Sequence, residues 1–545
     1  MELKKNIAEE FKKTQTLPDL VDYVTSQFHD MTAIKKIMNE EVISYSFYQL
    51  RKDSYRIATY LIQENIVQRN IALIGNLSYE WLIAFLGVTA SGNVAVLIDK
   101  EIHEDDTVKL LEQSDASAII IDSAFHEKAS GLKEKYNKLE YLLSYGEIQD
   151  YSNINCLMGE DISYSHKVSG PDQNAIITFT SGTTGSNKAV LLSHRNVCDN
   201  LCCCIHIFDG VLKPAYKTIP LLPQHHMFGL TAGLLLPYYF GLTICFGGGL
   251  KYISSDLKMF QPDFLVAVPM IVEGLYKRIL SEIKKSGLGK EFIQIVDHSN
   301  LLLQSGTDIR KSLFRDIQEF FGGNLRLIVC GGAFLDPILM NQYEEIGIPL
   351  RNGYGITECS PVIACNLLHN HMEGSVGSIV PRPYCEVKIV DGEILVRGTI
   401  VMKEYYKDKE STEAAFEDGW FKTGDLGYID NDFLFITGRK KNLIILSDGN
   451  NISPEELENM LEKIPLIKEV YACGKSYHNT ILVTTCIHPD YEYAEEQKIH
   501  DIEREVEREI SQINAKLPHY KKIQKIEIYE DAFPKTSLGK IKRYL

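Results

Sequence analysis

Short apolar runs that each end in a glycine-rich or polar loop constrain the fold of this chain more than any other feature. Between residues 45 and 125, runs such as Asn70–Ile74 and Ala118–Asp122 alternate with stretches whose apolar residues have helical spacing. This alternation is typical of an α/β layered domain with a mostly parallel sheet. Because open α/β sheets bind ligands at the carboxyl ends of their strands, we expect the loops to converge on one ligand site.

One of these loops has the chemistry of a phosphate-binding loop. The run Ile176–Phe179 predicts a buried strand, and a loop rich in Gly, Ser and Thr separates it from Lys188. Glycine permits close backbone approach, so several N–H groups can point at one anion, while hydroxyls and the lysine add donors and positive charge. The residues are Thr180, Ser181, Gly182, Thr183, Thr184, Gly185 and Lys188. Taken alone, such a loop can also be a solvated turn, and its spacing does not fit a Walker A loop.

Length, charge and cysteine content exclude several classes of protein. A chain of 545 residues is too long for a single core, so we expect several structural units. The net charge of −16 argues against nucleic acid as the main partner. The first residues are charged and lack an apolar segment, which makes a secretory signal unexpected. The twelve cysteines have no framework spacing, so we predict reduced thiols and a cytoplasmic location.

Two segments could be mistaken for special sites. The stretch from Leu230 to Leu250 is long and nearly uncharged, but it contains Gly and Pro and no positive flank precedes it. We therefore expect a buried helix followed by a strand rather than a transmembrane segment, and leave peripheral membrane contact open. The adjacent cysteines Cys202–Cys204 lack the spread that zinc sites use, so we expect them in the core.

The pattern of predicted strands and helices changes in the last part of the chain. From Cys385 to Phe435 short β segments with glycine turns predict a β-rich subdomain. A charged junction follows at Lys440–Asn442, and beyond it Ser453 and Pro454 are typical of the start of a helix. We predict a first domain over residues 1–439 and a separate small α+β domain over residues 440–545.

Seven motifs occurring together carry a resemblance to a known family. In chain order they are Thr180–Lys188, His226–Gly229, Gly331–Ala333, Tyr354–Glu358, Thr423–Asp425, Gly438–Asn442 and Pro534–Lys540. With them the chain resembles the adenylate-forming enzymes, the superfamily of acyl-CoA synthetases, peptide-synthetase adenylation domains and luciferases. The one departure is Asn187, which stands where the family usually has proline before the lysine.

The resemblance implies both the architecture and the small molecules that the protein uses. The expected fold is α/β, with a large N-terminal domain of layered, mostly parallel sheets plus a β-rich subdomain, and a small mobile α+β C-terminal domain. The expected cofactors are ATP, Mg²⁺ and coenzyme A. The expected partners are a small carboxylic acid and coenzyme A, with a carrier protein as the alternative thiol.

The resemblance also assigns residues to the nucleotide. Thr183 and Thr184 would hold the β- and γ-phosphates, Thr357 would reach the α-phosphate, and Glu358 would bind Mg²⁺, which prefers hard oxygen ligands. Asp425 would accept the ribose hydroxyls, with Arg439 close by. The adenine slot would be formed by Gly331, Gly332, Ala333, Asn352 and Tyr354, with Gly353 and Gly355 in the same stretch.

Three further positions carry roles that the resemblance implies. Lys540 would be catalytic, because attack of a carboxylate on the α-phosphate builds negative charge that a fixed ammonium can stabilise. Taken alone, it would rather be read as an exposed lysine in a basic tail. Lys441 would be the hinge between the domains. His226 would line the acyl tunnel, and its alternative is a packed core histidine.

The implied reaction has two steps, adenylation of a carboxylic acid and transfer of the acyl group to a thiol. Between the steps the small domain would rotate about Lys441 and carry Lys540 away. The stretches Val268–Arg278 and Gly438–Glu456 look most like those of medium- or long-chain fatty acyl ligases. Two other classes stay open: a catalytically silent relative that only binds nucleotide, and a luciferase-like oxygenase.

Overall fold

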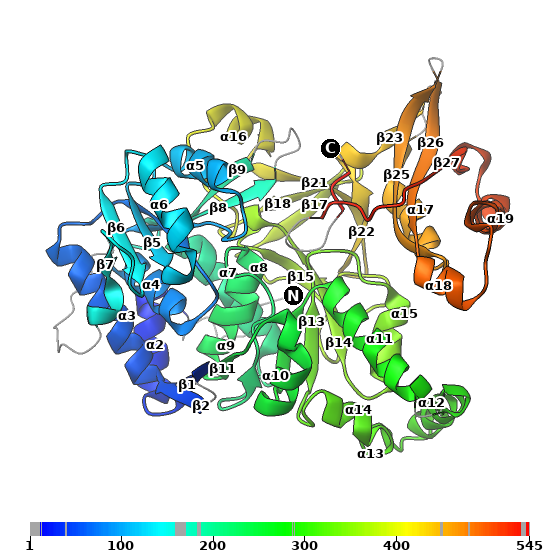
Figure 1. The fold of residues 1–545 in the computed structure, drawn as a ribbon, viewed down its shortest axis with the longest axis horizontal. Helices are drawn as coiled ribbons and strands as arrows, with labels where there is room; N and C mark the ends of the chain where they lie inside the picture. Colours follow the sequence, from blue (N-terminus) through cyan, green and yellow to red (C-terminus); the bar gives the residue numbers. More distant parts are fainter. Residues whose placement is uncertain are drawn as a thin grey trace. The chain divides into compact units, whose positions relative to one another are not determined.

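The computed structural model describes residues 11, 13–38, 41–157, 170–181, 187–285, 287, 289–446, 451–477, 480–535 and 541–543. The chain forms two compact units (Figure 1). Unit 1 comprises Met1–Glu386 and Val396–Phe421, and unit 2 comprises Val387–Leu395 and Lys422–Leu545. Each unit is described by itself. The domain limits 1–439 and 440–545 stay a prediction.

The first sheet of unit 1 confirms the predicted alternation of strands and helices. Its strand order is β19-β9-β8-β4-β3-β5-β6-β7. The strands from β8 to β7 are parallel to their neighbours, and β9 runs antiparallel to both β8 and β19. The bounds are β3 (Asn70–Ile74), β4 (Val94–Leu97), β5 (Ala118–Asp122), β6 (Tyr141–Tyr145), β7 (Ser152–Asn153), β8 (Asn174–Ser181), β9 (Asn187–Ser193) and β19 (Glu404–Tyr405).

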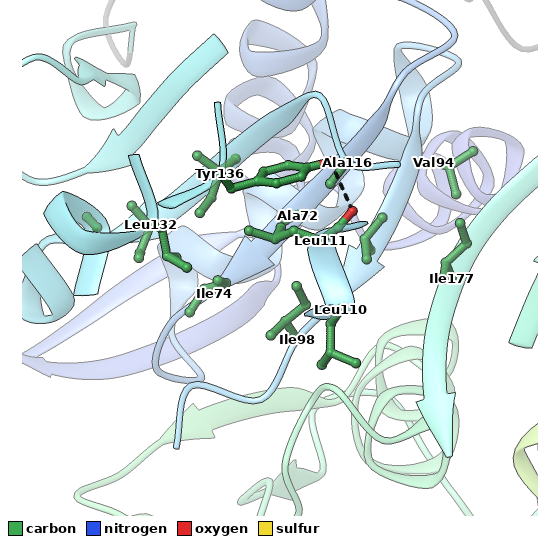
Figure 2. Close-up of a cluster of buried hydrophobic side chains, with 14 of the residues drawn as sticks. Ala72, Ile74, Val94, Ile98, Leu110, Leu111, Ala116, Leu132, Tyr136 and Ile177 are labelled. Carbon is green, nitrogen blue, oxygen red and sulfur yellow. Dashed lines mark hydrogen bonds between the residues drawn. The ribbon is translucent and has the colours of Figure 1, made fainter. Parts of the chain in front are cut away.

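Helices α4 (Tyr79–Ala90), α5 (Glu104–Gln113) and α6 (His126–Lys135) follow β3, β4 and β5 along the chain. The inner sides of α5 and α6 share one apolar core with alternate residues of the strands, and Figure 2 shows these side chains. Tyr136 is the residue after α6, and its hydroxyl donates to the Leu111 carbonyl of α5 at 3.2 Å. The aromatic ring is therefore buried while its hydroxyl keeps a hydrogen-bond partner. This core holds the carboxyl ends of β3, β4 and β5 in fixed positions.

The second sheet of unit 1 has the order β16-β15-β14-β13-β12-β10-β11-β1-β2. From β14 to β1 the neighbours are parallel, and the strands at both ends are antiparallel. The bounds are β1 (Thr32–Met38), β2 (Glu41–Ser46), β10 (Lys217–Thr218), β11 (Thr243–Phe246), β12 (Phe264–Ala267), β13 (Leu327–Cys330), β14 (Leu350–Gly355), β15 (Val362–Cys365) and β16 (Ser378–Ile379). Helices α11 (Pro269–Lys285) and α15 (Pro337–Glu345) follow β12 and β13.

The apolar stretch from 230 to 250 is a buried helical segment followed by a strand, as predicted. It includes a π-helical turn at Thr231–Leu235, then α9 (Leu236–Tyr239) and β11, and the helical residues are buried. No helix within the described ranges is both long enough and apolar enough to cross a membrane. The predicted burial of Cys202–Cys204 is also confirmed, because α7 (His194–Phe208) turns all three thiols into the core.

Unit 2 has the mixed α+β character that the sequence indicates. Strands β17 (Glu386–Val390), β18 (Glu393–Arg397), β21 (Trp420–Asp430) and β22 (Phe433–Arg439) are neighbours in that order. A second, three-stranded sheet consists of β25 (Ile467–Tyr477), β26 (Thr480–Pro489) and β27 (Lys525–Ile528). Helices α17 (Pro454–Leu461) and α19 (Ile502–Lys516) contribute apolar side chains to the core on one side of this sheet.

Ser453 precedes α17 as predicted, but its hydroxyl does not cap the helix. It donates instead to the Thr437 carbonyl at 2.9 Å. The helix therefore begins at Pro454 with two acidic residues, Glu455 and Glu456, in its first turn, where their charge complements the helix dipole.

Candidate active site

The predicted phosphate loop is the connection between two paired strands of unit 1. Strands β8 and β9 are antiparallel, with Thr180 opposite Lys188 and Ser181 opposite Asn187. Gly182, Thr183, Thr184 and Gly185 lie outside the described residues, so their phosphate contacts stay a prediction. The last residue of β4, Leu97, pairs with Thr178 of β8, and the Thr178 hydroxyl donates to the His225 carbonyl at 2.9 Å. The strand leading into the loop is therefore firmly held.

The residues predicted for the adenine slot lie together at the ends of two parallel strands. Gly331, Gly332 and Ala333 follow β13, whose last residue, Cys330, pairs with Asn352 of β14. The stretch from Asn352 to Glu358 is partly exposed, whereas the residues on either side of it are buried. The sheet therefore brings both sequence motifs to one edge, as predicted.

Gly355 at this edge is required by close backbone packing, and Gly331 lies close to an aromatic ring. A Cβ on Gly355 would lie 2.1 Å from the Pro361 carbonyl oxygen, and one on Gly331 would lie 3.0 Å from the Phe228 ring. Since real Cβ atoms do not approach other atoms so closely, a side chain at Gly355 would push β14 away from the segment it packs against. The shape of this edge is thus determined largely by backbone atoms.

The amide of Asn352 has a fixed orientation. Its Nδ2 donates to the Ser375 carbonyl at 3.0 Å, and its Oδ1 accepts from Asn366 Nδ2 at 2.5 Å. Asn366 also donates to the Ser375 carbonyl at 3.0 Å, which closes a small network. An amide oxygen has two lone pairs, so Oδ1 retains one acceptor position that suits the amino group of adenine.

Glu358 is held by two hydrogen bonds from one segment of unit 1. Its Oε1 accepts from the Tyr405 hydroxyl at 2.8 Å, and its backbone carbonyl accepts from the Met402 N–H at 2.6 Å. The described part of the chain contains no group of three or more His, Cys, Asp or Glu suited to a metal. Mg²⁺ usually takes one or two carboxylates and completes its shell with water and substrate phosphates, so a single oriented carboxylate fits this ion.

His226 directly precedes the short helix α8 (Met227–Leu230) and follows the partly buried His225. The two imidazole centres are 4.3 Å apart, and His225 Nε2 is 3.5 Å from Asp99 Oδ2, just beyond the end of β4. Burial lowers the pKa of His225, which favours its neutral form despite the nearby carboxylate. The acyl-tunnel role of His226 stays a prediction.

In unit 2, Asp425 and Arg439 are brought together by the pairing of β21 with β22. They are opposite residues, and Arg439 Nε is 2.6 Å from Asp425 Oδ1. The Asp425 side chain is only 4% exposed, whereas that of Arg439 is 41% exposed. Lys441 lies in the following turn at Lys440–Asn442, where burial and the neighbouring Arg439 lower its pKa. The roles in ribose binding and as a hinge stay predictions.

Lys540 lies outside the described residues, but the nearest described residues before and after it have contacts within unit 2. Lys535 pairs with Ile541 in an isolated β-bridge, and Lys535 Nζ lies 2.6 Å from Glu469 Oε1. Beyond Lys540, the Arg543 guanidinium forms an ion pair with Glu458, which is 7% exposed. Burial raises the pKa of Glu458 to about 7, although Arg543 opposes this rise.

Sequence reasoning missed Tyr405 completely. Its hydroxyl reaches Glu358, which is 47 positions away, and its ring centre lies 4.6 Å from Lys188 Nζ. The only local signal is a pair of tyrosines, Tyr405 and Tyr406, after an apolar run, which is a common pattern. Its contacts depend on the pairing of β19 with β9, and no local spacing predicts that pairing.

Comparison with known proteins identifies the family and agrees with the fold. The family described as "AMP-binding enzyme" matches residues 21–406, and the "AMP-binding enzyme C-terminal domain" matches residues 441–545. A solved structure, the anthranilate CoA ligase AuaEII in complex with anthranoyl-AMP, has a TM-score of 0.76 at 20% identity. The match covers 96% of this chain and 95% of the AuaEII chain, so the two proteins share the fold.

Two curated relatives carry names with a stated activity. One is the long-chain-fatty-acid–CoA ligase FadD15 of Mycobacterium bovis, 29% identical over 425 residues, which are 73% of this chain and 69% of the relative. The other is the chloroplastic long-chain-fatty-acid–[acyl-carrier-protein] ligase AEE15 of Arabidopsis thaliana, 26% identical and covering 85% of this chain and 75% of the relative. Since the first family model alone covers more than half of the sequence, this chain belongs to the AMP-binding enzyme family.

Proposed function

We propose that the protein activates a medium- or long-chain fatty acid with ATP and transfers the acyl group to coenzyme A. The products would be acyl-CoA, AMP and pyrophosphate. The observation that carries the proposal is the edge where β13 and β14 end, since it places Gly331–Ala333 beside Asn352–Glu358 in a member of the AMP-binding family. The name of the M. bovis relative supports a long-chain fatty acid as the substrate.

In the first step a carboxylate oxygen attacks the α-phosphorus, and the bond to pyrophosphate breaks. We assign the phosphates to the loop from Thr180 to Lys188, the α-phosphate to Thr357, and the ribose to Asp425. Glu358 would hold Mg²⁺, which neutralises charge on phosphate oxygens when bound. Lys540 supplies the positive charge that stabilises negative charge developing between the carboxylate and the phosphate.

In the second step a thiol attacks the carbonyl carbon of the acyl-adenylate, the C–S bond forms, and AMP leaves. Coenzyme A is the acceptor that the name of the first relative supports. A discrete acyl carrier protein is the second candidate, because the A. thaliana relative is named for that acceptor. Both acceptors present the same kind of thiol, so the adenylation step does not distinguish them.

We also propose a cytoplasmic location. All twelve cysteines are free thiols, and most of them are buried. Free thiols persist where the surroundings are reducing, as in the cytoplasm.

Acid-dependent exchange of radioactive pyrophosphate into ATP, across a panel of fatty, aryl and amino acids, tests the first step directly. We expect exchange with medium- or long-chain fatty acids and none without an acid. Thioester formation with coenzyme A and with an acyl carrier protein bearing its phosphopantetheine arm then identifies the acceptor. If no acid supports exchange, the chain is a silent relative that binds nucleotide without turnover.

A further inference from the structure

Tyr405 contacts two residues that the proposed function assigns to ATP and Mg²⁺. Its hydroxyl donates to Glu358 Oε1 at 2.8 Å, and its ring centre lies 4.6 Å from the Lys188 ammonium. We propose that Tyr405 is a positioning residue that orients Glu358 for Mg²⁺ and holds Lys188 for the phosphates. This inference rests on the proposed function, because it takes the roles of Glu358 and Lys188 from it.

The backbone around Tyr405 is fixed by its pairing with the strand that follows the phosphate loop. Tyr405 pairs with Val190 of β9, and the next residue, Tyr406, donates its N–H to the Ala189 carbonyl at 2.7 Å. The N–H of Tyr405 donates to Thr412 Oγ1 at 3.0 Å, and the residue is only 5% exposed. The ring therefore has little freedom to move.

The segment before Tyr405 is anchored in the same unit. Asn196 of α7 donates from its amide to the carbonyls of Thr399 and Val401, at 2.7 and 2.9 Å. The Met402 N–H then donates to the backbone carbonyl of Glu358. One short segment thus holds Glu358 at its backbone through Met402 and at its carboxylate through Tyr405.

The hydroxyl of Tyr405 is a permanent donor. An ionised carboxylate can only accept, so the Tyr405 hydroxyl is the donor of the hydrogen bond to Glu358. A hydrogen bond to Oε1 fixes the plane of the carboxylate before an ion binds. Removing such a partner of a metal-binding carboxylate typically weakens metal affinity tenfold or more.

The face of the Tyr405 ring contacts the ammonium group of Lys188. An ammonium within about 6 Å of an aromatic centre is attracted by the ring quadrupole. Lys188 is the last residue of the predicted phosphate motif, and its side chain is flexible in isolation. Contact with Tyr405 restricts the positions that its ammonium adopts, so less freedom is lost when a phosphate binds.

Three variants separate the two contacts. Tyr405→Phe removes the hydroxyl and keeps the ring, whereas Tyr405→Leu removes both. Tyr406→Phe is the matched control, since it removes one hydroxyl from the adjacent residue, where that hydroxyl contacts Asn70 and Asp115, both at 3.1 Å. Calorimetry on the full chain measures the affinity for α,β-methylene-ATP, once with Mg²⁺ and once with EDTA, and circular dichroism checks folding.

With Mg²⁺ we expect Tyr405→Phe to bind the analogue about tenfold more weakly than the wild type, and with EDTA we expect equal affinity. In both conditions Tyr405→Leu should bind the analogue about threefold more weakly than Tyr405→Phe does, because the contact with Lys188 is lost as well. Tyr406→Phe should match the wild type throughout.

The inference is overturned if Tyr405→Phe binds the analogue as tightly as the wild type in Mg²⁺. It is also overturned if Tyr405→Phe loses as much affinity in EDTA as in Mg²⁺, or if Tyr406→Phe loses as much affinity as Tyr405→Phe. Those outcomes leave the proposed function intact as long as the wild type binds the analogue. A wild type that binds it in neither condition overturns the proposed function instead, and the inference with it.

Discussion

Glu358 in unit 1 and the described residues on either side of Lys540 in unit 2 are held by different kinds of interaction. Glu358 is held by two uncharged donors, the Tyr405 hydroxyl and the Met402 N–H, on a strand end whose shape depends on backbone packing. The residues described on either side of Lys540 form ion pairs, Lys535 with Glu469 and Arg543 with Glu458. A hydrogen bond from an uncharged donor is less sensitive to salt than an ion pair between two exposed or partly exposed charges.

This difference indicates that Glu358, proposed to hold Mg²⁺, is oriented before an ion binds, while the ion pairs beside Lys540, proposed to be catalytic, respond to solution conditions. A carboxylate that waits for an ion benefits from a rigid partner. A lysine that acts in the first half-reaction and withdraws in the second needs supports that can change. The predictions below test the comparison, starting with the largest effect.

Lys540→Ala should have the largest effect on activity. It removes the positive charge assigned to the adenylation step, and we expect pyrophosphate exchange to fall by about a hundredfold to a thousandfold. Thioester formation from a supplied acyl-adenylate should remain largely intact. Lys542→Ala is the control for an ordinary lysine in the same basic tail. Equal loss of both half-reactions, or equal loss in the control, would contradict the assigned role.

Gly355→Ala tests whether the unit 1 site depends on backbone packing. Its Cβ would lie 2.1 Å from the Pro361 carbonyl oxygen, so we expect the free energy of unfolding to fall by more than about 2 kcal/mol. Gly274→Ala on α11 is the matched control, because a Cβ there meets nothing within 4 Å. It should leave stability unchanged or raise it by about 0.5–1 kcal/mol. Urea denaturation measures both, and similar curves for the two variants would refute the packing argument.

Arg543→Met removes the charged partner of Glu458 and so releases the described residue that follows Lys540 from its ion pair. We expect adenylation to fall about tenfold, because a buried carboxylate is left without its partner, while transfer from a supplied acyl-adenylate changes little. In the double variant Glu458→Gln with Arg543→Met, part of the activity should return, since no buried charge remains. If the single variant adenylates at the wild-type rate, the ion pair does not support the loop.

The sequence predicts the strand ends well and the side-chain partners poorly. The run Ala118–Asp122 coincides with β5, and the motifs at Gly331 and Asn352 meet because β13 and β14 are neighbours. Local apolar runs and glycines determine such features, and the parallel sheet then aligns the strand ends.

The partners of these residues come from distant parts of the chain. Arg543 reaches Glu458 across 85 positions, and Tyr405 reaches Glu358 across 47. Asn352 likewise depends on Asn366 for the orientation of its amide. No local spacing encodes such contacts, because they follow from how the folded segments pack against each other. The groups that orient the functional residues therefore had to be read from the structure.

Glu458 should give the smallest effect, a dependence of stability on pH. Burial raises its pKa from 4.5 to about 7, so between these values the folded protein binds more protons at this site than the unfolded chain. The stabilising contribution is complete below pH 4.5 and is lost as the pH rises through about 7. Between pH 6 and pH 7 the free energy of unfolding should fall by about 1 kcal/mol.

Glu458→Gln cannot titrate, so this fall should be absent from its urea denaturation curves measured at the same two pH values. Glu386→Gln serves as the control, because that carboxylate is more exposed and pairs with Arg397. Its variant should keep the pH dependence of the wild type. A fall of the same size in Glu458→Gln would show that another group titrates in this range. The ion pairs beside Lys540 would then differ from the hydrogen bonds at Glu358 in salt dependence alone.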